Sequence, residues 1–227
     1  MRLKLTVAAA IAVMTGLIVA GLAIGSSNKS SPSHMHDMAG MTAASATAAD
    51  LRVLLDRQLG QHAVLAMNAT NAGVTGSKAF PAAAKVLDQN SVALSKSIAS
   101  VYGAKAGNTF LNGKFMWRAH IKFFVDYTVA KAKGDKAGQT KAVANLKTYT
   151  VKFGDFLAGA TNLPKPAVRA DLLAHVLQLK GQLDAYAGKN YAKAASLYAA
   201  AYDHMFMTGD LLAGAIAKQF PEKFSTK

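Results

Sequence analysis

From residue 50 onward, apolar residues recur at the three- and four-residue intervals of amphipathic helices. The stretch around His120 is typical, because Met116, His120, Phe123 and Tyr127 fall on one helical face. Gly134 follows the last turn of this stretch, where a residue that tolerates a positive φ is expected. No segment alternates apolar and polar residues as a half-buried strand does. The pattern therefore predicts an all-α fold.

Turn and cap residues divide this region into elements. Asp50 is expected to cap the first helix, Gly103–Gly107 to break the chain, and Thr161–Pro166 to form a loop. The connections are short, which favours antiparallel neighbours and a six-helix bundle of three hairpins. The six predicted helices span residues 50–72, 81–102, 108–133, 136–160, 167–187 and 191–219.

The three hairpins share a weak internal repeat. In each, a histidine in the first helix precedes a turn glycine by thirteen or fourteen residues. The pairs are His62 with Gly76, His120 with Gly134, and His175 with Gly188. The spacing favours three divergent copies of one hairpin, each with its histidine at the same place.

The N-terminal part differs in composition from the helical region. Arg2 and Lys4 precede the uncharged run Leu5–Gly25, which is typical of an export signal or a membrane anchor, and both remain open. Residues 26–49 form a Ser-, Ala- and Thr-rich linker that we expect to be disordered. We therefore expect residues 50–224 to be the helical domain, on the outer side of the membrane.

Within the linker, residues 34–41 read HMHDMAGM and concentrate possible metal ligands. Thioethers favour Cu(I), and imidazole binds copper in either oxidation state. The candidate ligands of this tract are His34, Met35, His36, Met38 and Met41. The tract predicts copper binding, and the alternative is a low-complexity spacer without a ligand.

Composition and charge limit the kinds of site and partner that the protein can have. The chain has no cysteine, which excludes disulfides and thiolate metal sites. Its formal net charge is +14, with 26 Lys and Arg residues spread along the helices. This charge fits a solvated surface, or a surface that attracts an anionic envelope polymer or a membrane. Nucleic acid is not expected as a partner, because the N-terminal segment directs the chain out of the cytoplasm.

Four histidines occupy apolar stripes near the middle of four predicted helices. They are His62, His120, His175 and His204. If neighbouring helices alternate in direction, the imidazoles converge in one layer and could bind a metal, together with Met116 and Met207. Asp171, four residues before His175, could orient that ring as an outer-shell acceptor. The alternative is four structural histidines, each with its hydrogen bonds satisfied in the core.

Residue types argue against several classes of enzyme. Glu222 is the only glutamate, so a di-iron carboxylate bundle is excluded. The chain has no His-Glu-x-x-His, no haem-attachment motif, no Gly-x-Ser-x-Gly and no phosphate-binding glycine loop. Haem held non-covalently by two histidines remains open. We therefore expect a binding protein, with an oxidoreductase that uses haem or copper as the less favoured alternative.

Four short segments carry a resemblance to a known group of proteins. They are Leu-Gly-Gln-His (59–62), Trp-Arg-Ala-His (117–120), His-Met-Phe-Met-Thr-Gly-Asp (204–210) and Gln-Phe-Pro-Glu-Lys-Phe (219–224). Residues 50–224 thereby resemble small exported bacterial proteins labelled "copper amine oxidase". The resemblance implies an exported protein with a copper connection and assigns no catalytic residue. True copper amine oxidases are β-rich and build their cofactor from an Asn-Tyr-Asp/Glu tyrosine, whereas Asn190-Tyr191 precedes Ala192 here.

Two functions fit these observations. The first is an extracytoplasmic copper-binding protein for metal handling or resistance. The second is an envelope-associated bundle that binds anionic surfaces through its basic face, with purely structural histidines.

Overall fold

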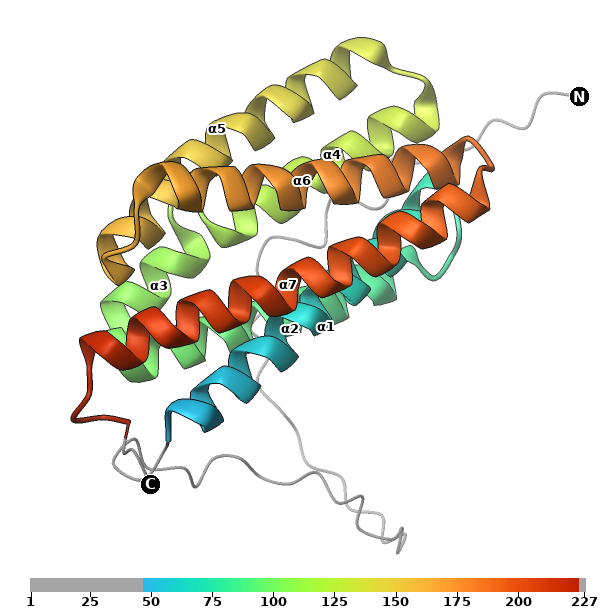
Figure 1. Cartoon of the computed structure of the whole chain (residues 1–227). Helices are drawn as coiled ribbons and strands as arrows, with labels where there is room; N and C mark the ends of the chain where they lie inside the picture. The colour runs from blue at the N-terminus through green and yellow to red at the C-terminus, as the bar shows by residue number, and fades with distance from the viewer. Residues whose placement is uncertain (1–46, 225–227) are drawn as a thin grey trace, which may run out of the picture. The chain divides into compact units, whose positions relative to one another are not determined.

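The computed structural model describes residues 47–224, and within them the chain is helical and forms no β-strand (Figure 1). The predicted all-α bundle is confirmed. The residues described form α1 (Ala48–Val74), α2 (Phe80–Tyr102), α3 (Ala104–Asn112), α4 (Trp117–Lys133), α5 (Lys136–Thr161), α6 (Lys165–Ala187) and α7 (Tyr191–Gln219). None of these helices is both long enough and apolar enough to cross a membrane. The predicted export segment and most of the linker lie outside the described residues.

The first helix begins earlier than the sequence suggested. Thr47, and not Asp50, is the N-cap of α1. The Thr47 hydroxyl accepts a hydrogen bond from the Asp50 N–H at 3.1 Å, and the Asp50 carboxylate accepts one from the Thr47 N–H at 2.9 Å. This reciprocal pair is a capping box, in which the acidic residue stands three positions after the cap.

The third predicted helix is divided in two. The break between helices that was predicted for Gly103–Gly107 is confined to Gly103, which adopts φ of 88°. Helix α3 therefore starts at Ala104 and includes Gly107. A turn then separates α3 from α4, and Phe115 within it adopts φ of 58°. An added Cβ at Gly113 would lie 2.6 Å from Cγ of Met116, which explains why the turn closes at a glycine. The bundle thus has six long helices and one short one.

The three predicted hairpins are α1–α2, α4–α5 and α6–α7. Gly76 and Gly134 have φ of 67° and 70° and close the first two turns as expected. The third turn differs, because Gly188 has φ of −80° and Lys189 carries the positive φ of 61°. The repeat in the sequence therefore corresponds to a repeated hairpin with a shifted third turn.

Helix α1 lies at the centre of the arrangement. It packs against α2, α4, α6 and α7, while α5 packs against α4 and α6. This position brings the middle of α1 into contact with three other histidine-bearing helices. The largest fully buried side chains include Leu55, Met67, Leu146, Tyr149, Phe153, Leu183 and Ile216.

The contact between α2 and α3 depends on Gly107. A Cβ there would lie 2.8 Å from the Ser95 carbonyl oxygen and 2.6 Å from the Cβ of Ala99. Ser95 also donates a hydrogen bond from its hydroxyl to the Gly107 carbonyl at 2.9 Å. Gly107→Ala should therefore lower the free energy of unfolding by about 1–3 kcal/mol.

Gly214→Ala is the matched control, because a Cβ at this position in α7 meets no atom within 4 Å. It should raise the free energy of unfolding by about 0.5–1 kcal/mol. Urea denaturation of both variants measures the difference. Equal effects would show that α2 and α3 do not approach this closely.

Candidate functional site

Four histidines meet in the interior of the bundle. His62 (α1), His120 (α4), His175 (α6) and His204 (α7) are 1%, 4%, 3% and 8% exposed. Ring centroids are 5.4 Å apart between His62 and His120 and 5.9 Å apart between His62 and His175. The His175 and His204 centroids are 6.2 Å apart. The expected convergence is found as a continuous histidine row, ordered His120, His62, His175 and His204.

The closest contact in the row joins His62 and His120. Their Nε2 atoms are 3.4 Å apart, which fits a long N–H···N hydrogen bond between neutral rings. The same spacing fits two ligands of one ion. With metal–nitrogen bonds of about 2.05 Å and a tetrahedral angle, the two nitrogens lie about 3.3 Å apart. A linear two-coordinate ion would need a separation of about 4.1 Å.

Aromatic rings hold this pair in place. His120 stacks on Tyr149 with centroids 4.6 Å apart and an interplanar angle of 22°, and His62 lies 4.7 Å from the Trp117 ring. Trp117 is itself fixed, because its indole N–H donates to the Ser91 hydroxyl at 3.2 Å. Sequence reasoning missed Tyr149. The signal was available, since Leu146, Tyr149 and Phe153 follow the three- and four-residue spacing of a buried stripe.

Burial keeps three of these imidazoles neutral. The pKa of His62 lies well below 6.5, mainly because burial disfavours the charged ring and secondly because His120 is close. Burial also lowers the pKa of His120 to about 3, helped by the neighbouring His175 ring and opposed by the nearby Trp117 backbone. The pKa of His175 lies well below its ordinary value, mainly because of burial and secondly because His62 and His204 are close. Neutral imidazole is the form that binds metals.

The other end of the row is more polar. His204 Nε2 lies 3.2 Å from a carboxylate oxygen of Asp171. The Thr208 hydroxyl lies 3.2 Å from the other oxygen of Asp171, and 3.1 Å from the His204 carbonyl. The expectation that Asp171 orients His175 is therefore wrong. Asp171 extends from α6 across to α7 and faces His204.

Most ring nitrogens of the row lack a hydrogen-bond partner of normal geometry. They are Nδ1 of His62, Nδ1 of His120, both nitrogens of His175, and Nε2 of His204. A buried polar atom without a partner costs about 1–3 kcal/mol. The alternative of four purely structural histidines stays a prediction. Within residues 47–224, however, no three His, Asp or Glu side chains are already arranged to hold a metal ion.

The two methionines expected beside the row behave differently from the histidines. Met207 is 62% exposed, so it does not face the row. Met116 is the N-cap of α4, partly buried against the core, and its carbonyl accepts the His120 backbone N–H at 3.2 Å. The interior site therefore offers imidazole nitrogens without a demonstrated thioether.

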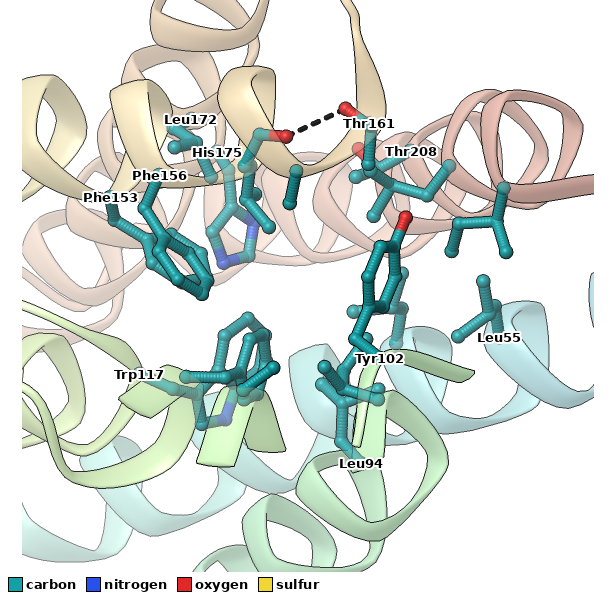
Figure 2. Close-up of a pocket in the computed structure, with 18 of the residues that line it drawn as sticks. Leu55, Leu94, Tyr102, Trp117, Phe153, Phe156, Thr161, Leu172, His175 and Thr208 are labelled. Atoms are coloured by element: carbon teal, nitrogen blue, oxygen red, sulfur yellow. Dashed lines mark hydrogen bonds between the residues drawn. The ribbon is translucent and has the colours of Figure 1, made fainter. Parts of the chain in front are cut away.

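A cavity of about 110 Å³ lies beside the row. Side chains from α1 to α7 line it, and most of them are apolar. Figure 2 shows His175 on its wall with Phe153, Phe156 and Trp117 nearby. Sites for drug-sized ligands measure about 300–1,000 Å³, so a haem would fit only if the helices moved apart.

The tract with His34, Met35, His36, Met38 and Met41 lies outside the described residues, and its copper binding stays a prediction. Comparisons of the chain with protein-family models, with curated proteins and with solved structures found no match. The resemblance to proteins labelled "copper amine oxidase" also stays a prediction. Function is therefore inferred from the histidine row and the cavity.

Proposed function

We propose that this protein binds a metal ion, with copper favoured, in the interior of the bundle and in the tract of residues 34–41. His62 and His120 would supply two Nε2 ligands, and a rotation of the His175 ring would bring a third. The protein would work outside the cytoplasm in metal handling or resistance, because the first 25 residues have the composition of an export segment or anchor.

One observation carries the proposal: the facing Nε2 atoms of His62 and His120 are 3.4 Å apart, in a row where most of the other ring nitrogens lack a hydrogen-bond partner. Such a pair needs almost no change in spacing to become two ligands of a tetrahedral ion. Imidazole suits both copper and zinc, so the preference for copper rests on the thioethers of the tract.

The lowered pKa values of the row distinguish its metal binding from that of ordinary histidines. A free imidazole has a pKa of about 6.5, so protons compete with the metal below about pH 6. His120 has a pKa of about 3, and those of His62 and His175 are also lowered. Metal binding by the row should therefore persist at pH 5.5, provided the bundle remains folded.

The test separates the row from the tract. In the full chain, His34 and His36 are replaced by Ala, and Met35, Met38 and Met41 by Leu, so that only the bundle ligands remain. Thermal unfolding at pH 7 is then measured with Cu(I) under reductant, with Zn²⁺ and with chelator. At a hundredfold excess over the dissociation constant, binding should stabilise the fold by about 2.7 kcal/mol.

Substitutions in the row locate the ligands. His62→Gln and His120→Gln should each remove the metal-dependent stabilisation. His204→Gln is the matched control and should retain it, because His204 lies at the Asp171 end of the row. If neither metal shifts the unfolding of the tract-substituted chain, the bundle histidines are not a metal site.

A further inference from the structure

The cavity beside the histidine row has the chemistry of a small-molecule site. Its aromatic wall consists of Tyr102, Phe110, Trp117, Tyr149, Phe153 and Phe156. Trp117 stacks on Phe110 with centroids 5.2 Å apart, and Phe153 stacks on Tyr149 at the same centroid distance. These stacked pairs give the cavity flat, rigid walls suited to a planar guest.

His175 supplies the polar group of this cavity (Figure 2). Its ring is 3% exposed, and neither ring nitrogen has a hydrogen-bond partner. A neutral imidazole offers one N–H donor and one acceptor nitrogen. A guest that donates or accepts one hydrogen bond would satisfy a group that the protein itself leaves unpaired.

Three other polar side chains on the wall are already engaged. The Thr161 hydroxyl donates to the Leu157 carbonyl at 2.7 Å, and the Tyr102 hydroxyl donates to Gln219 at 2.8 Å. The Thr208 hydroxyl is occupied by Asp171 and the His204 carbonyl. His175, in contrast, brings two unpaired ring nitrogens to the wall of this cavity.

The volume limits the guest. A cavity of about 150 Å³ in another protein stays dry and binds benzene. At about 110 Å³, this cavity fits a ring of about five atoms. We propose that it binds a small, neutral, planar and mostly apolar molecule that carries one hydrogen-bonding group, held by His175 and the aromatic wall. This site requires no metal, and the presence of chelator separates its test from that of the metal proposal, which also uses His175.

The single tryptophan of the chain provides the readout, because Trp117 lines the cavity. Trp117 fluorescence of the full chain is titrated with pyrrole, which donates a hydrogen bond, and with thiophene, a somewhat larger five-membered ring without a donor. Chelator is present throughout. Both should give saturable changes, with pyrrole binding about tenfold more tightly.

Two kinds of variant test the assignment. His175→Leu should leave thiophene binding in place and remove the preference for pyrrole. Ala106→Leu and Ala160→Leu, which fill the cavity from α3 and α5, should abolish both responses while circular dichroism shows the helices retained. Failure of wild type to bind either ring saturably, or equal affinity for the two, would overturn the proposal.

Discussion

The free energy of unfolding should fall by about 4 kcal/mol per pH unit as the pH drops below about 6. Each group that binds a proton only in the unfolded chain contributes about 1.4 kcal/mol per pH unit. His62, His120 and His175 are three such groups, because burial lowers their pKa values in the folded protein. Protonation therefore favours the unfolded state.

The sign and the window follow from these pKa values. The unfolded chain takes up protons near pH 6.5, the ordinary value for histidine, whereas His120 in the folded protein does so only near pH 3. Stability is fully present above pH 6.5 and is lost progressively below it. The pH range in which histidines dominate the loss of stability ends near pH 4, because aspartates also take up protons at lower pH. Since a domain of this kind has about 5–15 kcal/mol of stability, unfolding by about pH 4–5 is expected.

Urea denaturation at half-unit intervals between pH 7.5 and 4.5 measures this slope. His175→Leu puts an apolar side chain of similar size in place of the imidazole and removes one of the three titrating groups. The slope of the free energy of unfolding against pH should therefore fall by about a third in this variant. The same change should follow from His120→Leu. Equal stability at pH 7 and pH 5 would contradict the burial of neutral histidines.

The helices could be predicted because their signals are local. The three- and four-residue spacing of apolar residues identified six long helices, and it placed all four histidines on inward stripes. The division between α3 and α4 could not be found in this way. It requires Phe115 at φ of 58°, a conformation that a bulky side chain adopts only when surrounding contacts enforce it.

Contacts between helices explain the remaining errors. The buried face of α7 runs through Ala201, His204, Met205 and Thr208, so a residue three positions after His204 falls on its outer edge. Met207 is exposed for that reason. The partner of Asp171 depends on how α6 meets α7, which spacing within α6 does not determine. The cavity likewise depends on how side chains from seven helices fill a shared space.

Phe153→Ala should be among the most destabilising single substitutions, at about 3–5 kcal/mol. Phe153 is 0% exposed and contacts the rings of Phe110, Trp117 and Tyr149, with centroids 5.2–6.0 Å away. Its removal takes one ring from a packed aromatic cluster and enlarges a cavity that already exists. For a domain of this size the melting temperature should fall by roughly 6–20 °C.

Phe156→Ala is the matched control, because Phe156 is on the same helix and also lines the cavity but is only partly buried. It should cost roughly 1–2 kcal/mol, in proportion to the smaller area that it buries.

Stabilisation by benzene distinguishes an enlarged cavity in Phe153→Ala from a general loosening of helix packing. At a hundredfold excess over its dissociation constant, benzene should return about 2.7 kcal/mol to Phe153→Ala by occupying the vacated space. Little of this effect is expected in wild type, whose cavity is smaller than the one that holds benzene elsewhere. Equal costs for the two variants would mean that Phe153 does not hold the aromatic cluster together. If benzene did not restore stability to Phe153→Ala, the surrounding helices would have collapsed into the space, and the walls around His175 would be too soft to select a guest by size.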